Sequence, residues 1–287
     1  LSSGESSEPP STDLLPGSMI SLLLVRGDLN LTVDCTVTYR QGNNLYACGH
    51  RFLLTGPAKI PFAPARVVAT VASLASSFKL SAPGAMAGSI QQDRFGAIYG
   101  VIGETAPQIP VQIKLESTLN RTENYRFEVV QEPFLTPLLL NLALVSTLSA
   151  TERMIGPATL EIKGQIRLAN GETIELEDVV SGDINAAAGA AMAVATPLSY
   201  LLASGFPDLR VEGVDLSIVS RNEKRLATLE QVWSSKSEVR PGETIEVNAV
   251  LRTPAGEAVV KKIPVVIPES VSDKMLSIVV GSGSAIN

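Results

Sequence analysis

Short apolar runs of strand length, separated by glycine, proline and asparagine, recur along the first half of this 287-residue chain. Residues 19–39, MISLLLVRGDLNLTVDCTVTY, hold two such runs around an RGD turn, and the second run alternates apolar and polar side chains. The other runs are LYACGH (45–50), RVVATVASL (66–74), GAIYGVIG (96–103), IPVQIKLES (109–117) and YRFEVVQ (125–131). Short strands joined by turn residues in this way predict a β-barrel or a β-sandwich.

Two later segments have a helical pattern. Leucines recur at helical spacings in residues 133–153, and we expect this helix to pack across the barrel. Residues 184–207 are alanine-rich and uncharged, and they are long enough to span a bilayer. Because Pro197 interrupts them, we predict a buried helix rather than a membrane span. Between these helices, Asn170 and Gly171 predict the turn of a β-hairpin.

The pattern divides the chain into three parts. Residues 1–16 are rich in serine, proline and glutamate and are typical of a linker. Residues 17–205 are expected to form a β-barrel domain with two helices. Residues 206–287 alternate in strand fashion around RPGE and TPAGE, which predicts an immunoglobulin-like β-sandwich with Trp233 in its core. The predicted fold class is therefore mainly β with a few helices.

Composition excludes several classes of function. The net charge is −6 and the lysines and arginines are scattered singly, so no basic face is available for nucleic acid or an anionic membrane. One histidine and two cysteines without a C-x-x-C motif exclude a zinc cage and a thioredoxin-type site. The chain also lacks a phosphate loop and a dinucleotide fingerprint. We therefore expect no metal and no cofactor.

Cys35 and Cys48 leave two alternatives open. If residues 31–39 and 44–49 form a hairpin about RQGNN, the two cysteines fall nearly opposite each other. A disulfide would then close in an oxidising compartment. In the other alternative, both cysteines are small buried apolar side chains.

His50, in NNLYACGHRFLLTGP, is the candidate catalytic base because it is the chain's one imidazole. A Ser-His-Asp hydrolase needs that imidazole beside a hydroxyl nucleophile and a carboxylate. The alternative is a structural histidine that caps a turn through a ring nitrogen. The nearest candidates in sequence for the carboxylate are Asp34 and Asp93.

The segment APGAMAGSIQQDR (82–94) superficially resembles the G-x-S-G pattern of serine proteases. Ala87 occupies the position of the expected serine, and Ser89 lies one residue beyond the glycine. We therefore interpret the segment as a turn that leads into the strand at 96–103, and not as a source of the nucleophile.

Residues 15–131 resemble the SpoIVB-type serine peptidases. The family pattern G-T-[LV]-T-[YF]…A-x-G-H is matched by residues 35–39 and 47–50, with departures at both cysteines. The segment GSIQQDRFGAIYGVIG is similar to the family's G-x-I-x-x-[ND]-x-x-x-G-I-x-G strand pair. The resemblance implies a peptidase-like barrel in which His50 is catalytic. The family's serine belongs to a separate G-M-S-G-S-P motif, which these residues do not contain.

We consider three hypotheses for the function. The first is the histidine-bearing portion of an extracytoplasmic serine endopeptidase that cleaves itself or another protein. Its nucleophile-bearing part would lie upstream, and the isolated chain would then be inactive. Its partners would be a protein or peptide substrate and that upstream segment. The second is an inactive peptidase-like binding or scaffold protein of the bacterial cell envelope. The third is a cell-surface structural protein in which the match to the family is accidental.

Overall fold

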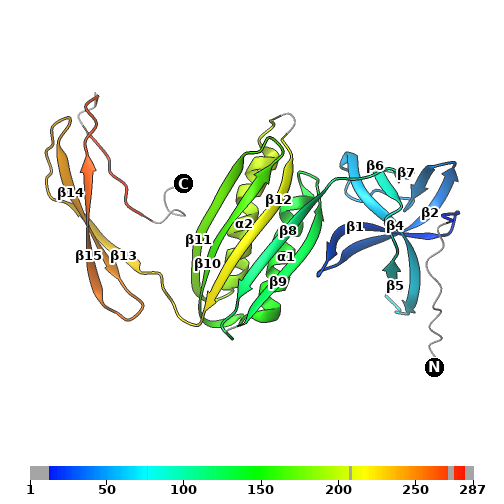
Figure 1. Cartoon of the computed structure of the whole chain (residues 1–287), viewed down its shortest axis with the longest axis horizontal. Coiled ribbons are helices and arrows are strands. Elements are labelled where there is room, and N and C mark those ends of the chain that lie inside the picture. Colours follow the sequence, from blue (N-terminus) through cyan, green and yellow to red (C-terminus); the bar gives the residue numbers. More distant parts are fainter. Residues whose placement is uncertain (1–12, 76, 120, 207–208, 271–274, 282–287) are drawn as a thin grey trace.

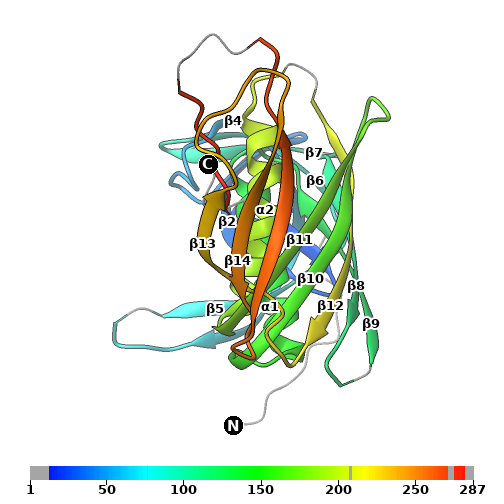
Figure 2. The ribbon, with the colours of Figure 1, turned by 90° about the vertical axis from the view of Figure 1, so that its left-hand side faces the viewer.

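The computed structural model describes residues 13–75, 77–119, 121–206, 209–270 and 275–281. Strands hold 53% of the described residues and helices 13%, which makes the protein mainly β. A closed barrel is followed by a sheet with two helices and then by a small C-terminal β module (Figures 1 and 2). The predicted fold class, mainly β with a few helices, a barrel and a β-sandwich, is confirmed.

The barrel is closed by the pairing of its first strand with its fourth. Its six strands follow the order β1-β2-β3-β7-β6-β4. They are β1 (Met19–Gly27), β2 (Leu31–Gln41), β3 (Asn44–Ala47), β4 (Gly56–Val71), β6 (Gly88–Arg94) and β7 (Ala97–Ile102). The far end of β4 continues beyond the barrel and pairs with β5 (Phe78–Pro83), so that the two strands project as an arm (Figure 2).

Five further strands extend the same sheet in the order β9-β8-β12-β10-β11. They are β8 (Gln108–Glu116), β9 (Thr122–Val130), β10 (Ile155–Leu168), β11 (Thr173–Ile184) and β12 (Val211–Arg221). The helices α1 (Leu135–Thr151) and α2 (Ala186–Ala203) both lie behind this sheet in Figure 1. The predicted helix at 133–153 thus covers the five-stranded sheet and does not cross the barrel, because its buried leucines meet the apolar side of these strands.

Strand alternation explains which face the helices cover. In β8, Ile109, Val111, Ile113 and Leu115 are buried while the residues between them are exposed. The same buried cluster continues into the barrel, so the barrel and the helix-covered sheet share one core.

At the junction of the barrel and the sheet, β1 pairs with β9, and a Cβ atom at Gly27 would lie 2.4 Å from the Arg126 carbonyl oxygen. Only glycine allows this close approach.

The C-terminal module has its own small core. Its sheet has the order β13-β14-β15, formed by β13 (Thr228–Ser234), β14 (Thr244–Arg252) and β15 (Ala258–Val266). Ile245, Val247 and Ile267 are buried there, and Ile278 and Val280 pack against them. Trp233 is 40% exposed, so its predicted place in the core is wrong.

Both domain boundaries in the structure differ from the predicted ones. Strand β12 belongs to the large sheet because it pairs with β10 and β8, so the C-terminal module begins after Arg221 and not at residue 206. Residues 1–12 of the predicted linker lie outside the described residues. Leu14 of that linker is 1% exposed and belongs to the barrel core, so the barrel domain begins before residue 17.

Helix α2 is long and apolar enough, by length and composition alone, to cross a membrane. In the structure it packs against α1, β10 and β11. Its buried side is formed mainly by alanines, together with Val194 and Leu198. Small side chains on this side let the helix lie close to the sheet.

Candidate functional site

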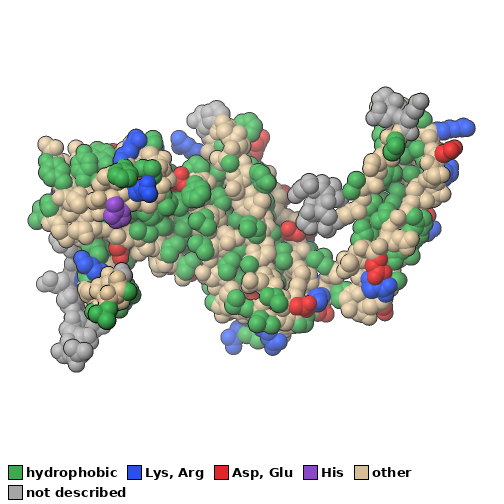
Figure 3. Space-filling model, turned by 180° about the vertical axis from the view of Figure 1, so that it is seen from behind, with side chains coloured by type: hydrophobic (Ala, Val, Ile, Leu, Met, Phe, Trp, Pro, Cys, Tyr) green, Lys and Arg blue, Asp and Glu red, His purple; other side chains and the backbone are tan. Residues whose placement is uncertain are grey.

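His50 lies in the loop that joins β3 to β4, which we call the His50 loop (residues 48–55). The chain leaves β3 through Cys48 and Gly49, whose φ angles are 70° and 71°. Two successive left-handed residues turn the chain sharply out of the strand. This turn places His50 on the barrel surface, where Figure 3 shows it as the purple side chain.

A disulfide anchors the start of the His50 loop. Cys48 is bonded to Cys35 on β2, with 4.7 Å between the two Cα atoms. The Cys48 N–H also donates a hydrogen bond to the Thr36 carbonyl oxygen at 3.0 Å. Of the two alternatives for the cysteines, the disulfide is therefore the one the structure forms.

Asp93, on β6, anchors the rest of the loop. Its side chain is fully buried, and its oxygens accept hydrogen bonds from the backbone N–H groups of Phe52 (2.8 Å), Leu53 (2.7 Å) and Thr55 (3.2 Å). Burial by itself raises the pKa of Asp93, but these N–H donors outweigh it and hold the pKa below its ordinary value. The carboxylate therefore stays ionised and bound to the loop.

The His50 ring is exposed and has a defined orientation. Its Nδ1 lies 2.7 Å from the carbonyl oxygen of Arg51. Because a carbonyl oxygen only accepts hydrogen bonds, Nδ1 of the neutral ring carries the proton. Nε2 is then the unprotonated nitrogen, which is the form that a general base requires.

The two candidate carboxylates have other partners. Asp34 accepts hydrogen bonds from the hydroxyls of Ser21 and Ser81, both at 2.5 Å. Asp93 is engaged by the backbone of the His50 loop, as described above. The hydrogen-bond partner of the His50 Nδ1 is therefore the Arg51 carbonyl oxygen and not one of these carboxylates.

The structure keeps Ala87 and Ser89 within the barrel wall. Ser89 is fully buried and its hydroxyl donates to the carbonyl oxygen of the next residue, Ile90, at 3.2 Å. The Ala87 N–H donates to the Phe62 carbonyl oxygen at 2.9 Å.

Contrary to the prediction of a turn over 82–94, residues 88–94 form strand β6 between β4 and β7. Glycine at position 88 misled the prediction, because here it permits close packing on the Phe62 ring.

Exposed apolar side chains lie in the His50 loop and in the turn after β6. Leu53 and Leu54 of the loop are 44% and 48% exposed. Phe95, in the turn after β6, is more exposed still, and the Arg51 guanidinium lies 5.8 Å from the centre of its ring. The sequence did not predict that the His50 loop and the turn after β6 lie close together, because neither segment carries a signal of this contact.

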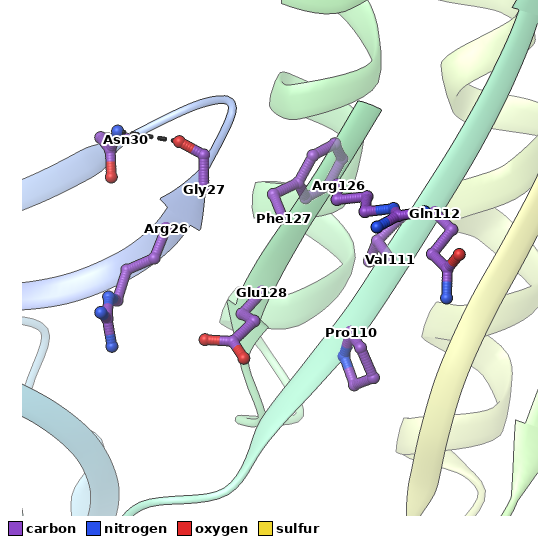
Figure 4. A pocket seen from close by; sticks show the side chains of 9 residues that line it. All are labelled: Arg26, Gly27, Asn30, Pro110, Val111, Gln112, Arg126, Phe127 and Glu128. Carbon is purple, nitrogen blue, oxygen red and sulfur yellow. Dashed lines mark hydrogen bonds between the residues drawn. The ribbon is translucent and has the colours of Figure 1, made fainter. Parts of the chain in front are cut away.

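A hollow elsewhere in the structure lacks such chemistry. A hollow of about 520 Å³ lies where the barrel joins the sheet, between β1 and the β8–β9 pair (Figure 4). Arg26 and Arg126 in its lining point in different directions, and the lining contains no histidine, cysteine or serine. Within the described ranges, no group of three His, Cys, Asp or Glu side chains is placed to hold a metal ion.

No protein-family model matches this chain, and no curated protein or solved structure matches it either. The resemblance to SpoIVB-type peptidases therefore rests on the sequence motifs alone. The geometry of the His50 loop is the independent observation that bears on function.

Proposed function

We propose that this chain is the histidine-bearing part of a SpoIVB-type serine endopeptidase, with His50 as the general base. The observation that carries the proposal is the exposed imidazole whose Nδ1 faces a backbone carbonyl, which leaves Nε2 open to a reactant. A catalytic base needs this combination of access and fixed tautomer.

In the proposed reaction, Nε2 of His50 removes the hydroxyl proton of a serine as the serine oxygen attacks the substrate carbonyl carbon. The imidazolium then donates that proton to the leaving amine, and the peptide bond breaks. The disulfide and Asp93 hold the loop at two points, so the ring needs little reorganisation before it reacts.

The serine is proposed to come from a separate segment, as the family's distinct serine motif implies. Ser89, the serine nearest to the family-like glycine pattern, is buried in a strand and cannot serve. The Cys35–Cys48 disulfide supports an extracytoplasmic location, because cytosolic thiols are usually kept reduced.

A fluorophosphonate probe tests the proposal. We expect the product of the complete reading frame to be labelled and this isolated chain to remain unlabelled. His50→Ala should abolish the labelling, whereas Lys59→Ala, an exposed cation on β4, should leave it intact. Labelling of the isolated chain, or labelling that survives His50→Ala, would contradict the proposal.

A second candidate function is peptide binding without hydrolysis. Among the described strands, β5 of the arm formed by β4 and β5 lies at the edge of the sheet, with Phe78 and Leu80 about half exposed. Such an edge suits the addition of an extended peptide as another strand. This alternative predicts that the complete reading frame contains no G-x-S-G-S motif and that its product is not labelled by the probe.

A further inference from the structure

The outer face of the two helices is exposed and carries no charge. Helices α1 and α2 contain 17 and 18 residues, and none of these is Asp, Glu, Lys or Arg. A helix that lies on the surface of a soluble domain normally presents charged residues to water. The outer surface of the two helices therefore has the composition of a buried surface.

Large apolar side chains form two stripes on this face, which we call the helical face. Phe134, Leu138 and Leu142 follow one side of α1 at intervals of one helical turn. Met192 and Tyr200 lie two turns apart on α2, and both are more than half exposed. Figure 3, which views the molecule from behind the sheet, shows hydrophobic and uncharged atoms over most of this region.

The two stripes lie on neighbouring antiparallel helices. Strands β9 and β10 are parallel to each other and antiparallel to β11 and β12, so the helices that connect each pair run antiparallel. Helices α1 and α2 also pack directly against each other. Phe134, before the first turn of α1, therefore lies at the same end of the layer as Tyr200, in the last turn of α2.

We propose that the helical face is the interface of a symmetric homodimer, in which a second copy of this chain covers it. At 1.5 Å per residue the helices are about 25 Å long, and together they are about 20 Å wide. Two such faces in contact would bury roughly 1,000 Å² in total, which reaches the lower limit for a specific interface.

The chemistry of the face favours a second copy over other occupants. The chain has a net charge of −6, so two copies repel each other overall, and contact is least unfavourable where neither surface carries a charge. An uncharged face meets its own copy without leaving any charge unpaired in the interface. Helices that bind membrane surfaces typically carry Lys and Arg beside their apolar stripe, and these helices have neither.

A hollow at the Tyr200 end gives the interface a site for a protruding side chain. It has a volume of about 770 Å³, and its lining is mainly apolar, with Leu168, Ile174, Pro197 and Leu201 among its residues. Glu172 and Arg210 are the two charged residues of the lining, and their opposite charges balance each other. Buried apolar anchors in such hollows carry much of the binding energy of protein interfaces.

Sedimentation velocity of the whole chain tests the proposal. We expect a dimer for the wild type and a monomer for Leu142→Glu, with the dissociation constant raised by a factor of roughly 100, because the substitution occurs in both copies. Leu226→Glu is the matched control: Leu226 is 49% exposed and Leu142 46%, but Leu226 lies outside the helices. The control variant should remain a dimer.

Tyr200→Glu on the other helix provides a second variant if Leu142→Glu does not fold, and circular dichroism checks both. A wild type that is monomeric at all concentrations would overturn the proposal. A Leu142→Glu or Tyr200→Glu variant that folds and stays dimeric would also overturn it. A monomeric wild type that binds phosphatidylcholine vesicles would identify lipid as the occupant instead.

Discussion

Asp93 accepts hydrogen bonds from three backbone N–H groups of the loop that carries His50. A buried carboxylate is costly without compensation, and here the N–H groups supply it. The same three bonds determine the path of the loop after His50. One buried residue on β6 thereby controls the position of an exposed residue that lies far from it in sequence.

Replacement of Asp93 by asparagine should destabilise the barrel. An amide accepts with one oxygen only, and its NH₂ group would face N–H donors, so we expect the free energy of unfolding to fall by about 3 kcal/mol. Urea unfolding at neutral pH measures this loss. An unchanged unfolding midpoint would show that the three hydrogen bonds contribute nothing.

The contribution of Asp93 should also depend on pH. Its pKa is lower in the folded protein than the ordinary value of 3.8, so the unfolded chain takes up the proton more readily. The stabilisation is therefore complete well above that value and is lost as the pH falls below it. The stability difference between wild type and Asp93→Asn should shrink in acid. A difference that is constant with pH would contradict this assignment.

At the scale of elements, the Cys35–Cys48 disulfide ties the end of β3 to the middle of β2. The two cysteines are 13 residues apart, so the bond closes a short loop of the unfolded chain. It also holds Cys48 in its left-handed conformation at the start of the His50 loop. The disulfide thus serves both the stability of the hairpin and the geometry of the candidate site.

The double variant Cys35→Ala/Cys48→Ala should unfold more easily. For a loop of this length we expect a loss of about 3 kcal/mol in the free energy of unfolding. Wild type treated with dithiothreitol should show a similar loss, whereas dithiothreitol should not affect the double variant. If reduction left the wild type unchanged, the bond would have no stabilising role.

At the scale of the whole molecule, a single core joins the barrel to the helix-covered sheet. The last strand of that sheet, β12, inserts between β10 and β8. It contributes four buried apolar side chains, Val211, Val214, Leu216 and Ile218. The strand that completes the middle of this sheet is therefore the last of its five strands along the chain.

A chain that ends at residue 205 should fail to fold cooperatively, whereas one that ends at residue 227 should fold. Loss of four buried apolar side chains removes roughly 8 kcal/mol, which is comparable to the whole stability of a typical domain. Thermal unfolding followed by circular dichroism compares the two chains. A cooperative transition in the shorter chain would show that β12 is dispensable.

The sequence alone was sufficient for the elements with strong local periodicity. The alternating run at 31–39 and the leucine spacing at 133–153 correspond to β2 and α1, and Asn170-Gly171 lies at the predicted hairpin turn. It also identified His50 as the one imidazole. These features depend on neighbours within a few residues, which sequence patterns record directly.

Only the tertiary structure decided which distant segments meet. The structure shows that β12 belongs to the large sheet and that Asp93 lies under the His50 loop. It also shows that Cys35 and Cys48 form a disulfide, which the sequence had left as one of two alternatives. Pairing across a sheet joins residues of any sequence separation, and an alternating strand pattern does not identify its partner. For the same reason the sequence could name the candidate base but not the carbonyl that orients it or the carboxylate that holds its loop.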